Sequence, residues 1–112
     1  MKHDNTVYIK HAIEAAEKAI TFIENKSRED IHNDEILALA ILRLLEIIGE
    51  AANCVSDQYK DAHSEIPWKK MIAMRNRLIH GYFDINYDIV WDTLKNDLPK
   101  LIIKLHSINS KQ

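Results

Sequence analysis

The chain has 112 residues, of which 46% are hydrophobic and 29% charged, and it contains two glycines, two prolines and one cysteine. A chain of this length can bury a core without disulfides or metal, but so few turn-forming residues exclude a sandwich or barrel of about seven or more strands. The formal net charge of −2 excludes a protein that coats itself in nucleic acid.

The first predicted helix runs from Asp4 to about Asn25. Its apolar residues recur at spacings of three and four, which places them on one helical face. They are Ile9, Ile13, Ala16, Ile20 and Ile23. A polar connection is expected over residues 25–30, because this segment has no apolar periodicity.

The second predicted helix begins at Asn33–Glu35 and ends near Val55. Its first residues supply a capping side chain and two negative charges, which favour the positive end of the helix dipole. The apolar residues that follow cover more than half of the helical circumference and leave a narrow polar stripe. The stripe consists of Arg43, Glu46 and Glu50. We expect this helix to be covered on more than one side, as the central element of a bundle or a dimer contact would be.

A third helix is predicted from Trp68 to His80, after a polar segment expected to form a loop or a single short turn. Pro67 suits its first turn because helix starts leave the missing N–H unpaired anyway. Gly81 suits its end, because glycine readily adopts the left-handed conformation that terminates helices.

The last helix is predicted from about Asn86, with apolar residues again at spacings of three and four. The apolar register continues across Pro99, so we expect a kink or a short restart there. Together these elements predict an all-α, up-and-down bundle of four to five helices in one domain spanning residues 1–112.

The cysteine content and the apolar runs bear on the cellular compartment. Cys54 has no second cysteine in the chain to pair with, and the first residues lack the apolar stretch of a secretory signal. The longest apolar run covers residues 36–42, far short of the roughly 20 residues that cross a bilayer. We therefore expect a cytoplasmic protein without a membrane span.

Ionisable side chains gather near the predicted end of the third helix. At about 100° per residue, Asn76 and His80 share a face, and Arg75 nearly coincides with Tyr82. Histidine can take and return a proton near neutral pH, and arginine offers a fork of donors to a phosphate. The set suits metal-free RNA cleavage, in which imidazole activates the 2′-hydroxyl or protonates the leaving oxygen and guanidinium stabilises the phosphate charge.

Each of these assignments has an alternative. Four arginines and six histidines give about 0.2 Arg-x4-His pairs by chance, so surface arginines beside a helix-end histidine would look the same. Asn76 would orient His80 through a hydrogen bond, or be an exposed amide. Glu50 would pair with Arg75 or Arg77 across the bundle, or belong to a solvated face.

Metal and aromatic features favour structural roles. Metal-binding bundles use two Glu-x-x-His motifs, whereas only Glu29-x-x-His32 fits here, so we expect no metal site. Cys54 is expected to be a small buried thiol. Trp68 and Trp91 are expected in the core and not as base-stacking platforms.

Several short motifs follow one another along nearly the whole chain. They are Leu45–Ala52, Ile66–Trp68, Met74–Asn76 with His80–Phe83, Val90–Trp91 and Asp97–Pro99. Their order resembles the HepT family of HEPN-domain toxins. The Ile-Gly-Glu-Ala and Pro-Trp elements are more specific than the Arg-x4-His spacing. The extended pattern Arg-x4-His-x-Tyr is present as Arg75, His80 and Tyr82.

The resemblance implies a homodimer with a metal-independent ribonuclease site at the dimer cleft and no cofactor. It further implies an RNA substrate and a paired minimal nucleotidyltransferase antitoxin. Arg75 and His80 would carry catalysis, and Tyr82 would be adenylylated, which adds bulk and negative charge beside Arg75. We expect the toxin of a toxin–antitoxin pair, of type II, or of type VII if neutralised enzymatically. The alternative is a non-catalytic helical module that only binds a nucleotidyltransferase or nucleic acid.

The low net charge conceals a basic segment. Residues 67–83 carry four basic side chains and no acidic one, which leaves −6 on the rest of the chain. The four are Lys69, Lys70, Arg75 and Arg77. A basic edge on an acidic body suits a protein that grips a few phosphates at one cleft.

Overall fold

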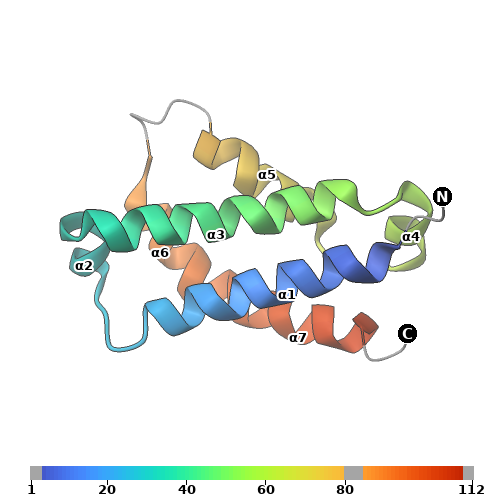
Figure 1. The fold of residues 1–112 in the computed structure, drawn as a ribbon, viewed down its shortest axis with the longest axis horizontal. Coiled ribbons are helices and arrows are strands. Elements are labelled where there is room, and N and C mark those ends of the chain that lie inside the picture. The colour runs from blue at the N-terminus through green and yellow to red at the C-terminus, as the bar shows by residue number, and fades with distance from the viewer. Residues whose placement is uncertain (1–3, 80–84, 110–112) are drawn as a thin grey trace.

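The computed structural model describes residues 4–79 and 85–109, and of residues 75–79 the backbone alone. All regular structure in these ranges is helical (Figure 1). The elements are α1 (Asn5–Phe22), α2 (Arg28–Asn33), α3 (Glu35–Cys54), α4 (Asp57–Ala62), α5 (Trp68–Ile79), α6 (Tyr87–Asp92), the π-helical turn η1 (Thr93–Asp97) and α7 (Leu98–Asn109). The predicted all-α, up-and-down bundle is confirmed.

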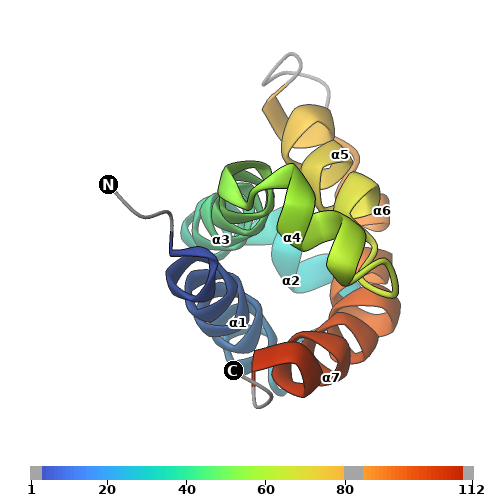
Figure 2. The same ribbon diagram turned by 90° about the vertical axis from the view of Figure 1, so that its right-hand side faces the viewer.

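The central helix is α3, which packs against α1 on one side and α5 on the other (Figures 1 and 2). α7 packs against α1, and the short α2 packs against both α3 and α6. α5 lies on the flank of the bundle, where its main contact is α3. The broad apolar surface predicted for the second helix therefore serves contacts in two directions.

The helix starts follow their capping residues. The Asp34 side chain accepts a hydrogen bond from the backbone N–H of Leu37 at 3.1 Å, as expected for the start of α3. The prediction of a plain connection over residues 25–30 was wrong in part, because α2 begins at Arg28. There the Asp30 carboxylate accepts a hydrogen bond from the backbone N–H of Ser27 at 2.7 Å, which closes the first turn.

The last helix is interrupted just before Pro99, as predicted. Proline offers no N–H to the carbonyl four residues earlier, and its ring crowds that carbonyl. The chain responds with the wider turn η1, in which the N–H of Leu98 donates to the carbonyl of Thr93. Leu94 and Leu98 are both buried, so the apolar register does continue across the interruption.

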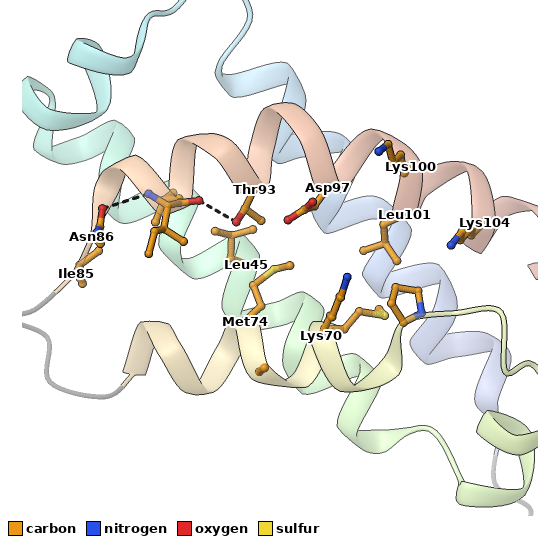
Figure 3. Close-up of a pocket in the computed structure, with 15 residues that line it drawn as sticks. Leu45, Lys70, Met74, Ile85, Asn86, Thr93, Asp97, Lys100, Leu101 and Lys104 are labelled. Atoms are coloured by element: carbon orange, nitrogen blue, oxygen red, sulfur yellow. Dashed lines mark hydrogen bonds between the residues drawn. The ribbon is translucent and has the colours of Figure 1, made fainter.

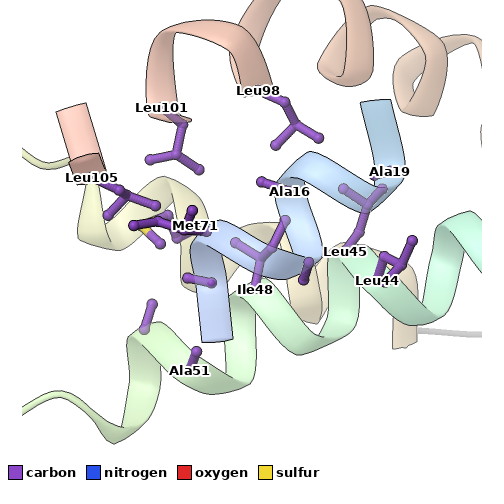
Figure 4. Close-up of a cluster of buried hydrophobic side chains, with 14 of the residues drawn as sticks. Ala16, Ala19, Leu44, Leu45, Ile48, Ala51, Met71, Leu98, Leu101 and Leu105 are labelled. Atoms are coloured by element: carbon purple, nitrogen blue, oxygen red, sulfur yellow. The ribbon is translucent and has the colours of Figure 1, made fainter. Parts of the chain in front are cut away.

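The core is built from aliphatic side chains of α1, α3, α5 and α7 (Figure 4). Ile48, Leu98 and Leu105 are fully buried, and among the described residues no polar or charged side chain is buried. Trp68 is buried in the core, as predicted, with 8% of its surface exposed. Its indole N–H donates to the carbonyl of His63 at 2.9 Å. Trp91 is only partly buried, with the Lys95 ammonium 5.6 Å from its ring centroid.

Cys54 is exposed, so its prediction as a buried thiol was wrong. It is the last residue of α3, where the buried stripe passes through Ala51, Ala52 and Val55, and position 54 falls on the opposite side. None of the described helices combines the length and the apolar character that crossing a bilayer requires.

Candidate functional site

The residues predicted to carry chemistry lie at and after the end of α5. The backbone places Arg75, Asn76 and Arg77 in the last turns of this helix. His80 and Tyr82 lie outside the described residues, as do the side chains of residues 75–79. The pairings within this set therefore stay predictions, and the structure describes the framework on both sides of it.

The start of α5 is anchored by a group of aromatic rings. The rings of Tyr59 and His63 lie 4.4 Å apart, and Tyr59 meets Trp68 edge to face at 6.4 Å. The hydrogen bond from the Trp68 indole to the carbonyl of His63 links two members of the same group. One turn further on, Met71 is 1% exposed and packs in the core. These contacts fix the direction in which α5 carries the motif.

The chain re-enters the described region at Ile85 and starts α6 with a well-formed cap. The Asn86 side-chain oxygen accepts hydrogen bonds from the backbone N–H groups of Asp88 at 3.0 Å and Ile89 at 3.2 Å. Asparagine is among the best N-cap residues because it satisfies N–H groups that a helix start leaves unpaired. The first turn of α6 is therefore fixed by its own cap.

Charged side chains fasten α6 to α2. The Arg28 guanidinium contacts the carboxylates of Asp88 at 3.1 Å and Asp92 at 2.9 Å, and His32 Nε2 lies 3.3 Å from Asp88. The hydrogen bond from Arg28, followed by that from His32, lowers the pKa of Asp88. Tyr87 adds an edge-to-face ring contact with His32 at 5.6 Å. No prediction from the sequence included this cluster, although the two aspartates stand four residues apart on one helix face.

A groove of about 630 Å³ separates α5 from α6, η1 and α7 (Figure 3). It is called the α5–α7 groove below. Its lining consists of Leu45, Pro67, Lys70, Met71, Ala73, Met74, Ile85, Asn86, Ile89, Val90, Thr93, Asp97, Lys100, Leu101 and Lys104. One end of the groove reaches Ile85 and Asn86, directly after the segment that carries His80 and Tyr82.

Glu50 has a described partner on its own helix. Its carboxylate lies 3.8 Å from the Arg43 guanidinium, which also contacts Glu46 at 3.0 Å. The polar stripe of α3 is thus linked along its own helix. Pairing of Glu50 with Arg75 or Arg77 stays a prediction, because those two side chains lie outside the description.

No group of three potential metal-ligating side chains is found among residues 4–74 and 85–109. His32, the histidine of the single Glu-x-x-His match, contacts Asp88 of α6. The histidine of that match therefore takes part in the contact between α2 and α6.

Comparison with known proteins identifies the family. The family model described as ribonuclease HepT-like matches residues 11–108. A protein of Thermococcus cleftensis named as a probable ribonuclease HepT is 39% identical over 101 residues, which cover 90% of this chain and 92% of that one.

Further relatives carry ribonuclease names. A protein of Caldanaerobacter subterraneus named as an RNase is 37% identical over 105 residues, or 94% of each chain. One of Methanocaldococcus jannaschii, also named as an RNase, is 34% identical over 100 residues, or 89% of this chain and 92% of its own. No solved structure matches at a significant level. The chain belongs to the HepT-like ribonuclease family.

Proposed function

We propose that the chain is a metal-independent endoribonuclease acting as the toxin of a toxin–antitoxin pair. The observation that carries the proposal is the match of a ribonuclease family to residues 11–108, which contain Arg75, His80 and Tyr82 in an intact Arg-x4-His-x-Tyr pattern. Arg75 and Asn76 stand in the final turns of α5, beside one end of the α5–α7 groove. This placement supports a site at that end of the helix.

The proposed reaction is an internal phosphoryl transfer. His80 removes the proton of a 2′-hydroxyl, whose oxygen then bonds to the adjacent phosphorus. The bond from phosphorus to the 5′-oxygen breaks, that oxygen takes a proton from solvent water, and the imidazolium of His80 returns its proton to the solvent. Arg75 stabilises the charge on the non-bridging oxygens, and Asn76 orients the imidazole. The products are a 2′,3′-cyclic phosphate and a 5′-hydroxyl.

We further propose a homodimer with the catalytic site at its cleft. Apolar side chains on the first turns of α3 support a contact between copies, because Ile36 is 82% exposed and Leu39 58% exposed. A double substitution, Ile36→Glu with Leu39→Glu, is expected to shift sedimentation to the monomer and to lower ribonuclease activity. Full activity of a monomeric variant would contradict the cleft site.

The antitoxin partner is proposed to be a minimal nucleotidyltransferase that adenylylates Tyr82. The added phosphodiester would place a negative charge near Arg75, where it would compete with RNA. The test combines antitoxin and nucleotide with wild-type toxin and with Tyr82→Phe, and follows both the mass of the toxin and RNA cleavage. Complete neutralisation of Tyr82→Phe would favour occlusion of the site over modification.

The ribonuclease assignment itself is tested by cleavage of RNA in EDTA. The wild-type protein is expected to cleave, and His80→Ala to lose at least about 100-fold in rate, because general acid–base groups contribute on that scale. His11→Ala serves as the matched control, since His11 is an exposed histidine on α1. Equal rates for the wild type and His80→Ala would reject the assignment and favour a non-catalytic binding module.

A further inference from the structure

The rim of the α5–α7 groove carries cations from two different helices. Lys70 projects from α5 toward the opposite wall, and Lys100 and Lys104 belong to α7 (Figure 3). All three side chains are exposed. Asp97 is the one acidic residue in the groove lining, so the lining has an excess of positive charge.

These lysines differ from the arginines elsewhere on the described surface. Arg28 and Arg43 each contact carboxylates within 4 Å. Within residues 4–74 and 85–109, no carboxylate lies that close to the ammonium groups of Lys70, Lys100 or Lys104. Three cations around one hollow, with no carboxylate within 4 Å among these residues, attract a polyanion.

The groove also runs along α5 toward its last turns, which carry Arg75 and Asn76. Asn86 and Ile85 line one end, while Lys104 lies toward the other (Figure 3). On α5, Arg77 follows Lys70 by seven residues, which is close to two complete helical turns. A chain of phosphates entering at Lys104 and passing Lys70 would therefore arrive at the end of α5.

Apolar parts of the groove lining suit the remainder of a nucleotide. Met74, Ile89 and Leu101 add a thioether and aliphatic carbons to the lining that carries the lysines. Such a surface can accept the faces of bases and riboses while the phosphates stay at the ammonium groups. A second copy of the chain fits less well, because a two-fold contact through this groove would bring the same lysines together.

We propose that the α5–α7 groove binds the phosphate backbone of single-stranded RNA next to the cleaved bond, through Lys70, Lys100 and Lys104. This inference rests on the proposed ribonuclease function and adds a path for the substrate outside the catalytic motif. Each lysine contacts a phosphate without reading the base, so the groove adds affinity without sequence preference.

The test compares two charge-reversed variants in binding of a fluorescent, 2′-O-methylated 12-nucleotide RNA, which cannot be cleaved. K100E/K104E changes the groove, and K10E/K18E makes the same change in charge on exposed lysines of α1. We expect K100E/K104E to weaken binding roughly tenfold or more and to lower the slope of log affinity against log salt by about 1.4, at roughly 0.7 for each lost phosphate contact. K10E/K18E is expected to stay within about twofold of the wild type.

Cleavage of the unmodified RNA separates the two proposals. If the wild type cleaves, K100E/K104E should raise KM more than it lowers kcat, because its lysines bind and do not react. If the wild type does not cleave, the ribonuclease proposal fails, while the binding comparison still decides the role of the groove. If K100E/K104E binds RNA as K10E/K18E does, the groove proposal is overturned.

Folding and oligomeric state are measured for the same variants. Circular dichroism checks that each variant folds, and K100Q/K104Q replaces K100E/K104E if the charge reversal prevents folding. Sedimentation shows whether the groove is an interface between proteins. A changed oligomeric state with unchanged RNA affinity would overturn the proposal.

Discussion

The two sides of α6 differ in how their charged groups are used. On the side of α2, the Arg28 guanidinium is shared between Asp88 and Asp92, and His32 joins them. On the side of α5, Lys70 and Lys100 line an open groove with no carboxylate within 4 Å among the residues that the structure describes. Charged groups that pair with one another stabilise the contact between helices. Charged groups that line a groove without pairing are available to bind a ligand.

Both sides of α6 pack on the same apolar core. A substitution in that core should therefore lower the free energy of unfolding more than a substitution on either side. Ile48→Ala removes a side chain that is 0% exposed and is expected to cost about 2–5 kcal/mol of unfolding free energy. Ile103→Ala, at a position 70% exposed, should change it by less than about 0.5 kcal/mol. Urea denaturation of both variants measures the difference. Equal costs would show that the described core does not stabilise the bundle.

Asn86 stands at the boundary between the two sides, where it caps α6. Asn86→Ala leaves two backbone N–H groups without their acceptor and should cost about 1 kcal/mol. Asn96→Ala, an exposed asparagine in η1, is expected to cost less than about 0.5 kcal/mol. The same urea experiment compares them, and a cost at Asn96 equal to that at Asn86 would argue against the cap.

Arg28 joins two helices, whereas the partners of Arg43 among the described residues lie on its own helix. Arg28→Ala is therefore expected to lower Tm more than Arg43→Ala, although both side chains are exposed and both effects are smaller than that of Ile48→Ala. Thermal unfolding at low and high salt checks this order. A larger decrease for Arg43→Ala would show that the α2–α6 contact adds nothing beyond a local pair.

The smallest effect concerns acid pH. Arg28, followed by His32, holds the pKa of Asp88 below its ordinary value, so the carboxylate favours the folded state whenever it is ionised. That contribution is present above about pH 4 and is lost as the pH falls through the lowered folded-state pKa. The stability advantage of the wild type over Asp88→Asn should shrink as the pH falls from about 5 toward 3. An advantage that grows over that range would contradict this assignment.

Local patterns in the sequence predicted most of the fold. The spacing of Ile9 and Ile13, the capping position of Asp34 and the break at Pro99 each depend on residues within a few positions of one another. The start of α2 was missed because a six-residue helix shows no apolar repeat. Cys54 was misplaced because it is the last residue of α3. Which side of a helix end is covered depends on where the neighbouring segments pack, and the local sequence does not show this.

Features that join distant parts of the chain could not be predicted in this way. The contact between Arg28 and Asp88 spans 60 positions in the sequence, and nothing local indicates that α2 and α6 are neighbours. The groove could not be predicted either, because it depends on how α5 is placed relative to α7. Of the candidate site, sequence and family resemblance indicated Arg75, His80 and Tyr82, and their mutual geometry lies outside the described residues.

In the proposed mechanism, Arg75 and His80 cleave RNA by attack of the 2′-hydroxyl without a metal ion. The most direct measurement is the chemistry of the RNA ends produced by wild-type protein in EDTA, with His80→Ala as the blank. The proposed mechanism predicts 2′,3′-cyclic phosphate and 5′-hydroxyl ends that are absent from the blank. Ends carrying 3′-hydroxyl and 5′-phosphate, or cleavage that disappears in EDTA and returns with a divalent metal ion, would contradict it.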